Sequence, residues 1–139
     1  MESIRKNSFS KRGIILFLSF VIPVIGFVFI LYFSHLWPFG DQSIVCLDLD
    51  SQYISFFSYL KEIFRDPTTL FYTFSKTLGG DMIGLVAYYL ISPFNIITLF
   101  FWTGDLPIAI TIIIILKIGC AGVSFNLLLR KEEYSSLIY

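Results

Sequence analysis

The chain has 139 residues, of which 56% are hydrophobic, 19% aromatic and only 14% charged. Soluble domains carry about a quarter charged residues, so this composition excludes an ordinary water-soluble domain. Ten basic residues balance ten acidic residues. Without a clustered basic excess, no nucleic acid is expected as a partner. We therefore expect an all-α membrane protein whose first partner is the lipid bilayer.

The first membrane span is predicted near the N-terminus. Residues 1–12 are polar and mainly basic, whereas residues 13–33 contain no charge. About 20 apolar residues suffice to cross the hydrocarbon core. The apolar stretch is longer than the core of a signal peptide, and no small-residue cleavage site follows it. The sequence predicts an uncleaved transmembrane helix over residues 13–33.

A long loop, residues 34–105, is predicted after this span, and its first part, residues 34–81, is polar and rich in aromatic residues. Within it, residues 52–65 have an apolar face at helical spacing. That face is formed by Tyr53, Phe56, Phe57, Leu60 and Phe64. Asp66-Pro67 ends the predicted helix. Because this amphipathic helix follows a membrane anchor, we expect its aromatic face to lie in the membrane interface.

Two further apolar stretches follow, and they differ in continuity. Residues 82–102 are uncharged but are interrupted by Ser92-Pro93, which predicts a broken, interfacial or re-entrant helix pair. Residues 106–129 contain one charge, Lys117, and form the second predicted transmembrane helix.

The distribution of basic residues favours two spans over the alternative of three. Basic residues collect on the cytoplasmic side of membrane proteins, which places residues 1–12 in the cytoplasm. If residues 82–102 crossed the membrane, Arg130 and Lys131 would lie outside, against this rule. We therefore predict two transmembrane helices flanking an extracytoplasmic loop. Residues 130–139 form a cytoplasmic end without a recognisable ending, so a truncated chain is expected.

The sharpest candidate for chemistry is the carboxylate pair Asp48 and Asp50. On an extended backbone, side chains two positions apart point the same way. The pair would then share a divalent cation, or one carboxylate would act as a base. The alternative is a solvated loop in which Asp50 or Ser51 caps the following helix.

Two lysines are candidates for binding phosphate. A cation such as Lys117 inside an apolar run normally faces protein, water or an anion. It either contacts a lipid phosphate or carboxylate, or snorkels or pairs with a partner outside this chain. Lys76 precedes Gly79-Gly80-Asp81, whose backbone amides could hold a phosphate, although no P-loop pattern surrounds them.

The remaining metal-ligating residue types give no site. His35 has no second ligand at metal spacing, so no metal site is predicted from it. Cys46 and Cys120 are expected to be unpaired and buried.

Several segments together resemble the amino-terminal region of YfhO-type bacterial membrane proteins. They are Pro38-Phe39-Gly40-Asp41, Asp48-Leu49, Gln52-Tyr53, Phe56-Phe57-Ser58-Tyr59-Leu60, Phe74 to Leu85, Tyr88 to Asn95 and Leu116-Lys117-Ile118-Gly119. The resemblance covers most of residues 36–131, in order and with plausible spacing. It is therefore more specific than any single motif.

That family is similar to GT-C glycosyltransferases of the bacterial cell membrane. The resemblance implies a polyprenyl-phosphate sugar donor and a cell-surface polymer acceptor such as teichoic acid. Asp48 would be the general base, with a more doubtful role for Asp50, and Lys76 and Lys117 would contact the donor phosphates. Metal dependence varies among such enzymes, so a divalent cation is possible.

The resemblance also implies that this chain is the N-terminal portion of a longer, multi-pass enzyme. Family members are several times longer, so the chain is expected to be inactive alone and to need the remainder of the protein or another membrane subunit. The alternative is a non-enzymatic membrane subunit or transporter fragment, in which residues 82–102 and Lys117 line a pathway. A small interaction protein is a third hypothesis.

Overall fold

The computed structural model describes residues 2–75 and 78–136, with side chains for 12–75 and 78–130. The described chain is helical and has no strand; an isolated antiparallel bridge joins Thr73 and Gly80. The helices are α1 (Glu2–Phe33), η1 (Leu49–Tyr53), α2 (Ile54–Arg65), η2 (Pro67–Leu70), α3 (Ile83–Leu85), η3 (Val86–Leu90), η4 (Pro93–Phe100), η5 (Thr103–Asp105) and α4 (Leu106–Ser136). The predicted all-α fold class is confirmed.

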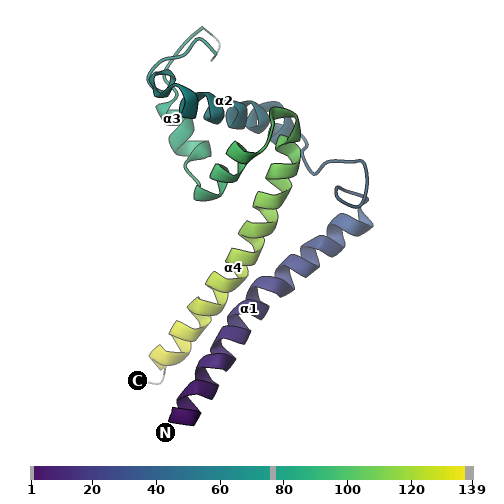
Figure 1. The fold of residues 1–139 in the computed structure, drawn as a ribbon, viewed down its shortest axis with the longest axis vertical. Coiled ribbons are helices and arrows are strands. Elements are labelled where there is room, and N and C mark those ends of the chain that lie inside the picture. Colours follow the sequence, from purple (N-terminus) through teal and green to yellow (C-terminus); the bar gives the residue numbers. More distant parts are fainter. Residues whose placement is uncertain (1, 76–77, 137–139) are drawn as a thin grey trace. The chain divides into compact units, whose positions relative to one another are not determined.

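Among the described residues, two helices are long and apolar enough to cross a membrane. Their candidate spans are Arg12–Phe33 in α1 and Thr103–Arg130, which includes most of α4. The chain divides into two compact units, residues 1–41 with 114–139 and residues 42–113. In the first unit, α1 and the C-terminal part of α4 lie side by side, with their polar ends at the same end (Figure 1).

Two glycines of α4 allow this helix to approach α1 closely. A Cβ atom added at Gly122 would collide with the backbone carbonyl of Ser19 and with Pro23. At Gly119 it would collide with the ring of Phe20. Small residues permit such close approach in membranes, where lipid offers apolar side chains no weaker contacts than protein does. The α1–α4 contact therefore depends on the absence of side chains here.

We expect Gly122→Ala to destabilise the α1–α4 contact by about 1–3 kcal/mol, because the backbone of Ser19 cannot move aside as a side chain would. Gly26→Ala in α1 is the matched control, since a Cβ atom there meets nothing within 4 Å. It should be neutral or stabilise the helix by about 0.5–1 kcal/mol. Thermal unfolding in detergent micelles, followed by circular dichroism, measures both. Equal effects of the two substitutions would contradict close packing at Gly122.

In the second unit, α2 buries the aromatic face that the sequence analysis placed in the membrane interface. Phe57 and Leu60 are buried, and Phe56 packs on Tyr89 of η3 with ring centroids 5.1 Å apart. Tyr53 packs edge-on to the same ring at 5.3 Å. The η3 and η4 helices therefore cover much of this face, whereas Phe64 at its end is exposed. The position of this helix in the membrane interface stays a prediction.

The apolar stretch over residues 82–102 is sharply bent. Two helical segments, Ile83–Leu90 and Pro93–Phe100, are together long and apolar enough for one span. They are bent by 98° at the break between them. Ser92 is extended, with φ −60° and ψ 129°, as expected for a residue preceding proline. Buried Asn95 secures the corner because its side-chain amide donates to the backbone oxygen of Tyr89 at 3.2 Å. If this bent pair formed one span, the described residues would contain three candidate spans. Without it they contain two, judged by length and composition.

The first turns of α4 complete the core of the second unit. Leu106, Ala109, Ile110 and Ile113 follow the i, i+3, i+4, i+7 spacing of one helix face, and all are buried. Thr111 is buried as well, and its hydroxyl donates to the backbone oxygen of Pro107 at 2.9 Å. The segment that leads into this helix, residues 99–105, is itself mostly exposed.

Candidate functional site

The backbone around Asp48 is helical, which corrects the expected geometry of the carboxylate pair. Asp48 has φ −61° and ψ −28°, and Asp50 lies inside the π-helix η1. In helical backbone, side chains two positions apart do not face each other. The premise of an extended strand, on which a cation shared by Asp48 and Asp50 depended, is wrong. Within the described residues, no group of three or more His, Cys, Asp or Glu side chains is placed to hold a metal ion.

The structure does not show the alternative role of this segment, in which a side chain caps the following helix. Asp48 stands at the N-cap of η1, but its side chain makes no capping hydrogen bond. Ser51 directs its hydroxyl to the backbone oxygen of Leu47 at 3.1 Å instead. Leu47 itself has a positive φ of 52°, a conformation that is uncommon for a residue with a bulky side chain. Asp48 and Asp50 are both exposed, so each carboxylate is accessible to a ligand.

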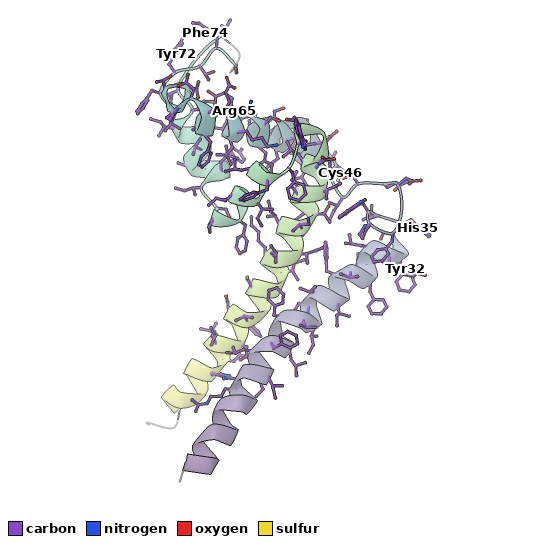
Figure 2. The ribbon with its side chains drawn as sticks, in the orientation of Figure 1. Tyr32, His35, Cys46, Arg65, Tyr72 and Phe74 are labelled. Atoms are coloured by element: carbon purple, nitrogen blue, oxygen red, sulfur yellow. The ribbon has the colours of Figure 1, made fainter. Side chains whose placement is uncertain are left out.

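Cys46, two residues before Asp48, was expected to be buried. It is an exposed free thiol, and Cys120 is a half-buried one. The expectation followed the usual burial of cysteine, but Cys46 (Figure 2) lies in a turn-rich segment in which most residues are exposed. Its exposure makes it a natural chemical probe for the neighbourhood of Asp48.

The structure describes one of the two lysines proposed to contact phosphate, Lys117, but not the other. Lys76 lies outside the described residues. Lys117 is exposed on α4, about 16 Å along the helix from Leu106 at 1.5 Å per residue. No side chain in the described part of the chain pairs with it. Lys117 belongs to the first unit and Asp48 to the second, so neither unit by itself contains both.

A basic groove in the second unit is the feature that sequence reasoning missed. Its cavity volume is about 370 Å³, and it contains two cations, Lys61 and Arg65, both from α2. The lining residues are Lys61, Phe64, Arg65, Leu99, Phe100, Phe101, Trp102 and Thr103. The cations are four positions apart on one helix, a spacing visible in the sequence. Their aromatic partners come from residues 99–103, and only the bend at Pro93 brings these near.

The electrostatics of the groove favour an anion. The ammonium group of Lys61 donates a hydrogen bond to the backbone oxygen of Phe101. Burial, and then repulsion by Arg65, lower the pKa of Lys61, while the more weakly acting carboxylate of Asp105 raises it. Neither cation forms an ion pair with a carboxylate among the residues described here. An incoming anion would relieve the repulsion between the two cations.

A second groove lies along another side of α2 and is hydroxyl-rich. Its volume is about 540 Å³, and it presents serine and tyrosine hydroxyls with one carboxylate, Glu62. The lining residues are Ile54, Ser55, Phe56, Ser58, Tyr59, Glu62, Ser75, Met82 and Leu85. Such a lining offers donors and acceptors for a polar ligand.

We expect Arg65→Gln to raise the pKa of Lys61, because it removes the nearby positive charge. Amine-reactive labelling of Lys61 across a pH series, quantified by peptide mass spectrometry, reports this shift as a higher pH of half-labelling. Because the folded pKa lies below the ordinary value, stability rises with pH between the two values, and Arg65→Gln should narrow that window. The matched control Glu62→Gln should leave the labelling curve in place. A curve unmoved by Arg65→Gln would show that the two cations do not interact.

The helices and the exposed polar segment between the candidate spans define a helical membrane protein. A family model described as bacterial membrane protein YfhO matches residues 19–138. The chain therefore belongs to the YfhO family of bacterial membrane proteins. Searches of curated proteins and of solved structures found no match to this chain.

Proposed function

We propose that this chain is the N-terminal module of a membrane glycosyltransferase, which moves a sugar from a polyprenyl-phosphate donor to a cell-surface polymer such as teichoic acid. The observation that carries the proposal is the state of Asp48. Its carboxylate is exposed and free of a capping hydrogen bond, and it lies in the segment between two candidate spans. Membership of the YfhO family supports the same assignment.

In this mechanism Asp48 acts as the general base. A hydroxyl is a poor nucleophile, so a base must accept its proton as the sugar leaves the lipid phosphate. Asp50 takes no equal share, because its side chain points elsewhere on the helical backbone. Lys76 and Lys117 are proposed to contact the donor phosphates. The hydroxyl-rich groove with Glu62, in the same unit as Asp48, is proposed to hold the polar acceptor.

The proposed site faces the outside of the cell. The four basic residues among the first twelve favour a cytoplasmic N-terminus. The bend of 98° supports an excursion of residues 82–102 that returns without crossing. Asp48 would then lie on the extracytoplasmic side, where the acceptor polymer is assembled.

We expect a chromosomal Asp48→Asn substitution in the bacterium that carries this gene to abolish glycosylation of the surface polymer. The amide cannot accept the proton, and its size is unchanged, so the protein level should not fall. Asp50→Asn is the matched control and should retain most activity. Sugar content of the purified polymer, normalised to protein by immunoblot, measures both. Normal glycosylation in the Asp48→Asn strain would remove this residue from the mechanism.

The topology has its own test, which uses native Cys46. In intact cells, a membrane-impermeant maleimide should label Cys46, because that thiol is exposed and lies in the proposed external segment. In a Cys46→Ser, Cys120→Ser background, Leu70→Cys should be labelled and Glu133→Cys should react only after permeabilisation. Labelling of both Leu70→Cys and Glu133→Cys in intact cells would show that residues 82–102 cross the membrane, and labelling of Glu133→Cys alone would invert the orientation.

A second candidate function is a non-enzymatic membrane subunit or transporter piece. The exposed cation Lys117 within a candidate span, together with the bent pair, favours it, since broken helices and intramembrane charges line transport pathways. Under this function Asp48→Asn would leave the surface polymer normal, whereas Lys117→Met would abolish the transport or subunit activity of the protein.

A further inference from the structure

We propose that the basic groove binds the phosphate headgroup of an anionic bilayer phospholipid and so fixes the second unit at the membrane surface. The groove joins Lys61 and Arg65 of α2 to exposed aromatic residues that directly precede α4. The proposal is independent of the glycosyltransferase assignment, because it uses neither Asp48 nor the donor.

The cations point to phosphate. Arg65 is exposed at the last turn of α2 (Figure 2), and a guanidinium matches two phosphate oxygens with parallel N–H groups. The ammonium of Lys61 has three donors, and the backbone oxygen of Phe101 takes one of them. Two donors are left over on a side chain that lines the groove, beside a second positive charge. Two cations held together without an ion-paired carboxylate are suited to a doubly coordinated anion.

The aromatic residues point to a lipid rather than to a soluble anion. Phe100 and Trp102 are more than four-fifths exposed, at 83% and 84%, and Phe64 is 62% exposed. Such rings collect at the level of lipid headgroups, where apolar and wet surroundings meet. The candidate span Thr103–Arg130 begins at the rim of this groove. A headgroup between the cations would therefore have its acyl chains start at the depth where the helix enters the hydrocarbon.

The volume is consistent with a headgroup. About 370 Å³ falls within the range of small-molecule sites, about 300–1,000 Å³. The ammonium group of Lys61 also donates a hydrogen bond to the backbone oxygen of Phe101. Its charge cannot move toward bulk water unless this hydrogen bond breaks.

Trp102 gives a direct readout. The chain has two tryptophans, so Trp37→Phe leaves Trp102 as the single emitter. This variant is placed in phosphatidylcholine nanodiscs that contain a lipid with brominated acyl chains at a fixed mole fraction. The brominated lipid is phosphatidylglycerol in one sample and phosphatidylcholine in the other. Brominated phosphatidylglycerol should quench Trp102 more strongly. Each cation beside an anionic headgroup contributes roughly a fivefold preference, so Arg65→Gln should lower the apparent preference about fivefold and Lys61→Gln with Arg65→Gln should remove it.

Three controls make the result decisive. Arg65→Lys should restore most of the preference, which separates lost charge from lost folding. Arg12→Gln removes the same charge from the first unit and should change nothing at Trp102. One equivalent of inorganic phosphate should not compete.

The outcomes that would overturn the proposal are equally specific. Equal quenching by the two brominated lipids would exclude an anionic lipid site. Equal loss with Arg12→Gln and Arg65→Gln would indicate general charge attraction instead of a site. Displacement of phosphatidylglycerol by one equivalent of polyprenyl phosphate would assign the groove to the carrier lipid in place of a bilayer phospholipid.

Discussion

The constraint on which this structure depends is that backbone polar groups need partners where water is scarce. In the long helices α1 and α4 the backbone groups are paired within the helix, except where Pro23 of α1 has no N–H to donate to the carbonyl of Ser19, and such pairing is why these segments can enter lipid. The bend at Ser92-Pro93 breaks that pairing. The side-chain amide of buried Asn95 donates a hydrogen bond to the backbone oxygen of Tyr89 there. The hydroxyl of buried Thr98 donates to the backbone oxygen of Asn95 at 2.7 Å. The corner is therefore held by polar side chains in an otherwise apolar stretch.

The same scarcity of water changes what holds the long helices together. Lipid solvates apolar side chains as well as protein does, so hydrophobicity gives α1 and α4 little reason to associate. The large apolar side chains of α1 are accordingly exposed, with only 6% of its candidate span buried. Contact is made instead where Gly119 and Gly122 let backbone meet backbone and ring. Shape, more than apolar area, selects this pairing.

The sequence carries the features that depend on local composition. The spans of α1 and α4 and the break at Ser92-Pro93 follow from hydropathy and from proline, and the structure agrees with all three. Features that depend on packing were not predictable. The aromatic face of α2 has the same spacing whether lipid or protein covers it, and only the fold shows that Tyr89 does. Likewise, Asp48-Leu49-Asp50 reads equally as strand or helix, and its helical backbone separates the two carboxylates.

The positions of two cations along the chain determine which partners each can reach. Lys61 lies in a groove at the rim of the span that begins at Thr103, a level where a lipid phosphate is present in any bilayer. Lys117 lies about 16 Å further along α4 than Leu106, roughly halfway through a hydrocarbon core of about 30 Å. At that depth a headgroup is out of reach without snorkelling, and a charge costs roughly 2.5–3.5 kcal/mol on insertion scales. A carboxylate or a hydrated cavity supplied by further protein offsets that cost. The groove is therefore suited to a bilayer headgroup, whereas Lys117 needs a hydrated cavity formed with further protein, and only there would it meet the phosphates of a donor.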